Sequence, residues 1–140
     1  MTIDLTKLIT TADKLAQAKA VKLAEINAAA QTDVAPYTAP YPQFEKETWD
    51  QQAAEAAAYA ADNTVATPWC DFAASKRGID RVTFIQKVQA KAEAFVQISA
   101  TVAGYRQGLE DQLDAIDLNA ADALTQIAAI TYTSPLTPPA

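Results

Sequence analysis

A single stripe of residues constrains the fold of this 140-residue chain more than any other feature. Small or apolar side chains recur there every three or four positions, a spacing that places them on one face of an α-helix. The stripe consists of Phe84, Val88, Ala92, Phe95, Ser99, Val102, Arg106, Leu109, Leu113 and Ile116. Asp80 precedes it as a candidate N-cap. The pattern predicts one very long helix, about residues 81–117, of roughly 55 Å at 1.5 Å per residue.

Such a helix is longer than a compact domain of this chain length is wide. We therefore expect either a kink near Gly104 and Gly108 or an elongated molecule. Arg106 interrupts the stripe with a charge, and Glu110, one helical turn later, is its expected partner.

Further helices are predicted on both sides of the long one, and no segment alternates in the way that a strand requires. Residues 1–31 form an amphipathic helix, with Lys19 in the middle of its apolar face. The Lys19 stem is expected to cross apolar surface with its ammonium in water, or else to pair with a specific carboxylate. A second helix covers about residues 45–62 and presents Trp49 beside a run of alanines.

A short helix should begin at Pro68, because Thr67 can cap it and proline suits the first helical position. Gly78 marks its end. Its expected buried side chains are Trp69, Phe72 and Ala73. A last helix follows Asn119 and is expected to bury Leu124, Ile127 and Ile130.

Proline marks two segments that we expect to be extended. Residues 32–43 contain three prolines and residues 131–140 contain three more. Each proline lacks a backbone donor and disfavours helical geometry at the residue before it. The predicted organisation is an all-α, elongated bundle of about five helices. It comprises an N-terminal helix (1–31), a proline-rich strap (32–43), a helical bundle domain (44–130) and an extended C-terminal arm (131–140).

Composition refines this prediction. Half of the residues are hydrophobic by class, but 32 of the 140 are alanine. Because alanine is small, this high hydrophobic content indicates helices that pack closely together more than it indicates a large core. Net charge alternates along the chain, with −6 over residues 32–75 and +4 over residues 76–106. This alternation favours antiparallel docking of the long helix's first half against the second helix, within one chain or between copies. Solvated helix faces would account for it equally well.

The chain contains no histidine and one cysteine, Cys70. Histidine-dependent triads, histidine metal sites and internal disulfides are thereby excluded. Carboxylates cluster at Glu45, Glu47 and Asp50 and again from Glu110 to Asp117, where helix ends and solvated faces explain them. We predict no catalytic, cofactor-binding or metal-binding residues. The acidic balance argues against nucleic acid, and no segment has the length of apolar sequence that a membrane span needs.

Aromatic residues gather around the first proline-rich segment. Tyr37, Tyr41, Phe44 and Trp49 are amphipathic or apolar rings of the kind that anchor protein interfaces. Alternatively, they attach the strap to the chain's own bundle. The full set of candidate interface residues is Tyr37, Tyr41, Phe44, Trp49, Lys19 and Tyr132.

Several short motifs resemble one class of protein. They are the run Phe44–Gln52 with Glu55, the segment Asp62–Pro68, the pair Arg77-Gly78, the segment Gly104–Gln107 and the segment Leu113–Asp117. Over about residues 44–130 this pattern resembles small proteins of tailed bacteriophages and prophages described as tail-fibre assembly or tail-associated proteins. The resemblance implies a non-enzymatic protein that contacts tail-fibre or baseplate subunits.

We therefore expect a bacteriophage tail or tail-fibre protein that acts by protein–protein contacts, as a virion structural subunit or a fibre-assembly factor. Self-association into a homo-oligomer is expected, with synthesis in the host cytoplasm and the virion tail as a further location. Two alternatives remain open at this stage. One is a helical-bundle enzyme or cofactor carrier that uses carboxylates, and the other is an amphipathic lipid-surface protein, which the scarcity of Lys and Arg on the polar faces disfavours.

Overall fold

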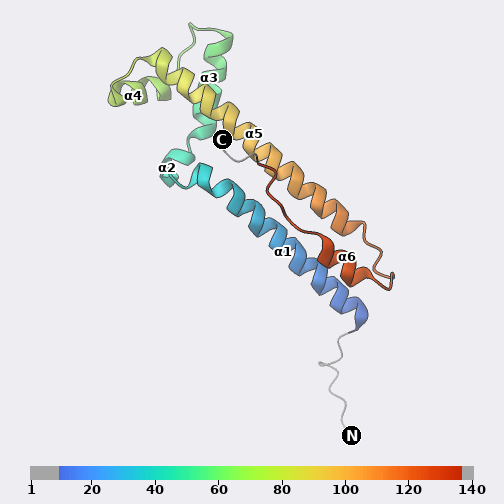
Figure 1. Cartoon of the computed structure of the whole chain (residues 1–140). Coiled ribbons are helices and arrows are strands. Elements are labelled where there is room, and N and C mark those ends of the chain that lie inside the picture. The colour runs from blue at the N-terminus through green and yellow to red at the C-terminus, as the bar shows by residue number, and fades with distance from the viewer. Residues whose placement is uncertain (1–9, 137–140) are drawn as a thin grey trace. The chain divides into compact units, whose positions relative to one another are not determined.

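The computed structural model describes residues 10–136, and every regular element in that range is an α-helix (Figure 1). The all-α prediction is confirmed. The helices are α1 (Thr11–Thr38), α2 (Gln43–Lys46), α3 (Trp49–Ala61), α4 (Pro68–Arg77), α5 (Arg81–Asp114) and α6 (Ala123–Ala129).

Two compact units make up the fold. The terminal unit combines the chain up to Val34 with the chain from Ala100 onward, and the central unit is the continuous segment Ala35–Ser99. Helices α1 and α5 therefore each contribute residues to both units. The segments predicted from local sequence, with a bundle domain at 44–130, cut across these units because the terminal unit joins stretches that are far apart in the sequence.

Helix α5 is the predicted long helix, with 34 residues. Its stripe is buried at Phe84 and Val88 in the central unit and at Leu109 and Leu113 in the terminal unit. Asp80 caps the helix as predicted, since its Oδ1 accepts a hydrogen bond from the Thr83 amide at 2.8 Å.

The helix continues without interruption through Gly104 and Gly108. A Cβ added at either glycine would meet no other heavy atom within 4 Å. Neither glycine is therefore required by close packing in the described residues.

The predicted extended segment at 32–43 is wrong over its first seven residues, because α1 runs on to Thr38 with Pro36 inside it. Proline removes only one helical hydrogen bond here, the one that residue 36 would donate to the Thr32 carbonyl. Thr32 lies on an exposed part of the helix, so water can serve that carbonyl. The last turn is still closed by the Ala39 amide, which donates to the Ala35 carbonyl at 2.8 Å.

At its other end, α1 begins with a reciprocal cap. The Asp13 amide donates to Thr10 Oγ1 at 3.1 Å, and the Thr10 amide donates to Asp13 Oδ2 at 3.2 Å. This arrangement satisfies donors of the first turn that have no partner within the helix. The prediction of helix over residues 1–9 lies outside the described residues.

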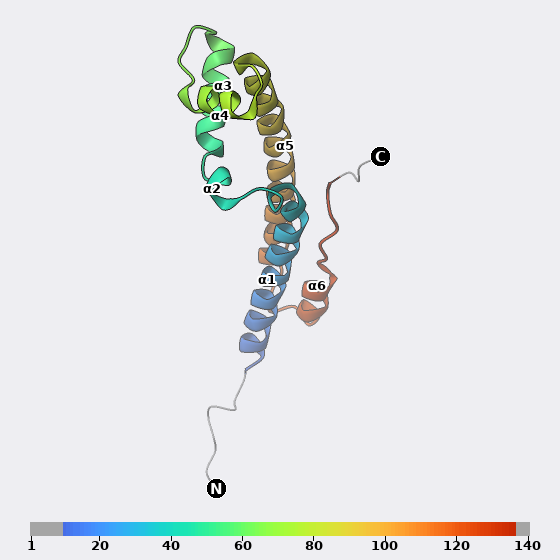
Figure 2. The ribbon, with the colours of Figure 1, turned by 90° about the vertical axis from the view of Figure 1, so that its left-hand side faces the viewer.

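The core of the terminal unit lies between α1, the second half of α5, and α6, which come together in both views (Figures 1 and 2). Its buried residues are Leu15, Ile26, Leu109, Leu113, Ala123, Ile127 and Ile130. Residues 131–136 follow without helix, and residues 137–140 of the predicted C-terminal arm lie outside the described residues.

In the central unit, α3 packs antiparallel against the first half of α5. Trp49, at the start of α3, contacts Phe95. Further along α3, the Ala56 carbonyl accepts a hydrogen bond at 3.1 Å from Nε2 of Gln89, which lies six residues closer to the start of α5 than Phe95 does. The core residues are Ala56, Cys70, Ala74, Phe84, Ile85 and Val88. The expected antiparallel docking of these two helices therefore occurs within one unit. It is built from the contact of the Trp49 and Phe95 rings, from small buried residues such as Ala56, and from the hydrogen bond that Gln89 donates.

Two side chains that we expected to be buried are exposed. Phe72 is 77% exposed because α4 turns Cys70 and Ala74 inward, and position 72 lies on the opposite side of so short a helix. Leu124 is 53% exposed, since α6 buries the narrow face that carries Ala123 and Ile127.

Candidate functional site

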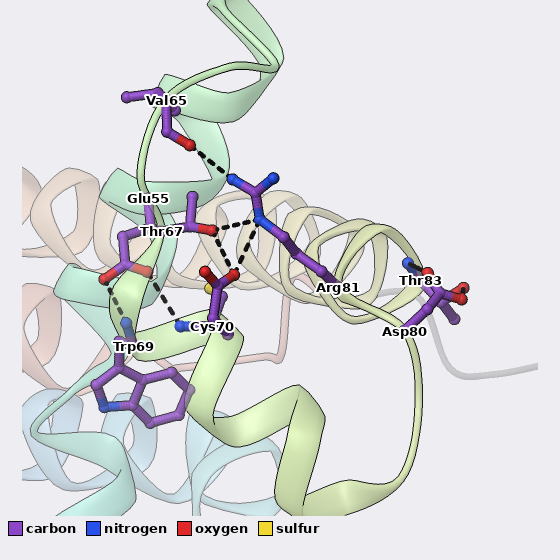
Figure 3. A network of polar contacts seen from close by, with 9 residues as sticks. Glu55, Val65, Thr67, Trp69, Cys70, Asp80, Arg81 and Thr83 are labelled. Carbon is purple, nitrogen blue, oxygen red and sulfur yellow. Dashed lines mark hydrogen bonds and ion pairs between the residues drawn. The ribbon is translucent and has the colours of Figure 1, made fainter.

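A cluster of polar contacts joins α3, α4 and α5 in the central unit (Figure 3). Glu55, on α3, directs its carboxylate at the N-terminus of α4. Its Oε2 accepts from the Trp69 amide at 3.2 Å and its Oε1 accepts from the Cys70 amide at 3.0 Å. These amides belong to the first turn of α4, where no helical acceptor exists. A side chain from a neighbouring helix therefore caps α4, and Thr67 supplies no side-chain cap.

Arg81 forms the second half of this cluster. Its Nε donates to Thr67 Oγ1 at 2.8 Å and pairs with Asp71 Oδ1 at 2.9 Å, while its Nη2 donates to the Val65 carbonyl at 2.6 Å. The guanidinium also lies over the Tyr59 ring, 5.2 Å from its centroid. One arginine thus ties the start of α5 to α3, to α4 and to the loop between them.

The polar groups of this cluster are paired with one another, and these pairings hold the three helices together. Both Glu55 oxygens and the Arg81 guanidinium are engaged by neighbouring groups, as Figure 3 shows. Burial, reinforced by the nearby Glu55 charge, raises the pKa of the Cys70 thiol to about 11. The thiol is therefore protonated at neutral pH, whereas nucleophilic attack and metal binding use the thiolate.

The four aromatic residues around the first proline-rich segment divide into two pairs. Tyr41 packs edge-on against Trp49, with 5.3 Å between ring centroids, and Trp49 packs against Phe95 at 5.5 Å. Lys91 Nζ lies 5.2 Å from the centroid of Tyr41. These two rings attach the segment to its own unit. Phe44 is 72% exposed, and Tyr37 is exposed as well, so this second pair is available to a partner.

Lys19 and Tyr132, the other candidate interface residues, lie in the terminal unit. Lys19 Nζ is 3.8 Å from Asp114 Oδ1, so the alternative in which it pairs with a carboxylate is the one observed. Arg106 pairs with Glu110 as predicted, with 2.8 Å between its Nη1 and Oε2 of the glutamate.

Tyr132 fastens the segment after α6 to α1. Its hydroxyl donates to Asp33 Oδ2 at 2.7 Å, and its ring packs edge-on against Tyr105 with centroids 5.1 Å apart. The Ser134 hydroxyl donates to the same carboxylate at 2.8 Å. Burial and the hydrogen bond to Asp33 raise the pKa of Tyr132 well above its usual range. We call the group Asp33, Tyr105, Tyr132 and Ser134 the tyrosine latch.

One further surface, a groove between α1 and α6 in the terminal unit, was not predicted from the sequence. Val21 and Leu124 line it, and they are 58% and 53% exposed. Val21 is one of many exposed residues on α1, and nothing in the local sequence distinguishes it from the others. Leu124 is predicted from the sequence to be buried, so it gave no indication of a groove.

Two further observations concern the described residues. In the range 10–136, no three metal-binding side chains of the kinds His, Cys, Asp or Glu come together. Across the same residues, none of the helices combines the length and hydropathy that crossing a membrane would demand.

A family model described as the HI1402 helical domain matches residues 90–131. The matched stretch covers the later part of α5, the turn after it and α6, and the helices found there agree with that description. It is less than half of the chain. No curated protein and no solved structure matches this chain.

Proposed function

We propose that this chain is a non-enzymatic bacteriophage tail or tail-fibre protein that acts through protein–protein contacts. It serves as a structural subunit of the virion or as a factor in fibre assembly, and its partners are tail-fibre or baseplate proteins. The sequence resemblance over residues 44–130 supports the tail assignment.

The observation that carries the interaction role is the set of large apolar side chains left in solvent. Phe72 and Phe44 are 77% and 72% exposed, and both lie in the central unit. Single exposed apolar residues are common on proteins, but aromatic residues, phenylalanine among them, are enriched where proteins contact one another. The polar cluster of the same unit, by contrast, is satisfied internally.

Particle composition tests this proposal. Mass spectrometry of purified particles should find the chain in stoichiometric amounts if it is a structural subunit. If it is an assembly factor, it should be missing from particles and should co-sediment with immature fibres from the infected or induced cell. Absence from both fractions would refute the proposal.

Substitution of the exposed rings gives a second test. Phe44→Ser and Phe72→Ser should each reduce incorporation or co-sedimentation while leaving the thermal stability of the isolated protein unchanged, because neither ring contributes to the core. Val82→Ser is a matched control, since Val82 is a smaller and less exposed apolar residue of the same unit. Equal effects of all three variants would count against anchoring by the phenylalanines.

A further inference from the structure

The groove between α1 and α6 has a volume of about 470 Å³ and opens widely to solvent. It is lined by Lys14, Gln17, Ala18, Val21, Lys22, Glu25, Leu124, Ile127 and Ala128. Two of the larger apolar side chains, Val21 and Leu124, stand in solvent on its two sides. The alanines between them let another helix approach closely.

The α1 side of the groove has an internal symmetry. Lys14, Ala18, Val21 and Glu25 follow one another at spacings of four, three and four, which places them along one line of the helix. The lysine and the glutamate lie at equal distances from the midpoint of this line, roughly 16 Å apart along the axis at 1.5 Å per residue. Alanine and valine are likewise equidistant from that midpoint.

This pattern matches itself when reversed. If a second α1 lies antiparallel on the first with the two midpoints aligned, Lys14 of each copy faces Glu25 of the other. Ala18 of each copy then faces Val21 of the other, a small side chain against a larger one. A two-fold interface requires this kind of self-complementary surface.

Both charges are open to such a contact. Lys14 is exposed and has no carboxylate within ion-pair distance in the range 10–136. Glu25 already contacts Lys22, with 3.4 Å between Oε2 and Nζ, but its side chain remains 61% exposed, which leaves room for a second cation.

We propose that the face formed by Lys14, Ala18, Val21, Glu25 and Leu124 is the interface of a two-fold homodimer, in which the α1 helices pair antiparallel. Leu124 of each copy packs against α1 of the other and closes the side of the groove. This inference deepens the proposed function and rests on its premise that the chain works by protein contacts. A second copy is the occupant because the mirrored charges suit it, whereas an unrelated partner would need no such symmetry.

Charge exchange tests the geometry directly. Lys14→Glu and Glu25→Lys each place like charges opposite each other at both ends of the interface, and should weaken the dimer by about tenfold, the equivalent of about 1.4 kcal/mol. The double variant restores opposite charges and should return the dissociation constant to within about threefold of the original. Analytical ultracentrifugation over a concentration series measures these constants, and circular dichroism checks that each variant is folded.

Separate variants test the apolar side chains of the proposed interface. Val21→Asp and Leu124→Asp should each shift the protein towards monomer. Val96→Asp is the control, because Val96 is 63% exposed but lies in the central unit, outside this face.

Three results would overturn the inference. They are a wild-type protein that stays monomeric over the whole series, a dimer that tolerates Val21→Asp, and single charge variants whose defect the double variant fails to reverse. The dimer and the proposed tail function can be refuted independently of each other. A monomeric chain found in stoichiometric amounts in particles would refute the dimer and leave the tail role intact, whereas a dimer absent from particles and fibres would refute the tail role alone.

Discussion

Removing the cap that α3 provides for α4 should destabilise the central unit by a predictable amount. In Glu55→Ala, the amides of Trp69 and Cys70 lose a charged acceptor at 3.2 and 3.0 Å. Hydrogen bonds to charged groups contribute about 1.5–3 kcal/mol each, and loss of a helix N-cap costs about 0.5–2 kcal/mol. Glu55 is only half-buried, so water will replace part of the loss. We expect the free energy of unfolding to fall by about 2–3 kcal/mol.

Urea denaturation followed by tryptophan fluorescence is the appropriate assay. Trp49 and Trp69 are the only tryptophans in the sequence, and both belong to the central unit, so the signal reports on the unit that contains the cap. Glu93→Ala is the matched control, because Glu93 is an exposed carboxylate in the same unit. Its effect should stay within about 0.5 kcal/mol. Glu55→Gln should fall between the two, since the amide keeps one acceptor oxygen and loses the other.

The cap would be refuted as a source of stability if Glu55→Ala were no more destabilising than Glu93→Ala. A similar loss in the Gln and Ala variants would instead show that the charge matters and that the remaining acceptor contributes nothing.

Three further predictions follow from single residues. Gly78→Ala should destabilise the chain by about 1 kcal/mol, whereas Gly104→Ala should stabilise it by a similar amount in thermal unfolding. The reason is that Gly78 has a φ of 81° and Gly104 is helical with free space around it. Cys70 should react with a thiol reagent only on unfolding. Since its pKa rises from an ordinary 9.0 to about 11 in the folded chain, the free energy of unfolding should decrease as pH increases from about 9 to about 11. Tyr132→Phe should cost about 1 kcal/mol by loss of its hydrogen bond to Asp33, and should speed amide hydrogen exchange in residues 131–136 without changing exchange in α4.

Local sequence was sufficient to predict a helix where interactions within a few residues determine its two ends. Helix α4 begins at Pro68 and ends at Arg77 as predicted, because proline at the start and Gly78 after the end act within a few residues. The stripe of α5 was equally informative, since helical periodicity over more than thirty residues leaves no other regular structure.

The proline rule failed at α1 for a physical reason. A proline restricts its own residue and the one before it, yet Pro36 sits in the last turn of α1, where only one hydrogen bond is lost. The residue whose carbonyl loses that bond, Thr32, is exposed. The prediction of an extended segment at residues 32–43 treated its three prolines as equally disruptive to a helix. Pro40 and Pro42, which follow the helix, are the two that obey the rule.

Pairings between distant residues could not be predicted at all. Tyr132 and Asp33 are 99 positions apart, and Trp69 and Glu55 are 14 apart on different helices. Nothing in the local pattern of either partner marks the other. For the same reason, the sequence singled out Tyr132 without its acceptor, and grouped Tyr41 and Trp49 with the exposed Phe44 although only Phe44 is open.

The division into two units has a consequence for how the chain folds while it is being synthesised. The central unit is one uninterrupted segment that is complete once Ser99 has been synthesised, and helix pairing within it needs only short loops to close. The terminal unit needs α6 and the tyrosine latch, which are synthesised only after the whole central unit. Until then, Leu15 and Ile26 lack the apolar partners that cover them in the finished protein. During synthesis, the apolar side chains of the early part of α1 are therefore exposed to solvent and to other proteins. A chain that stops before Ile127 would leave these side chains exposed permanently.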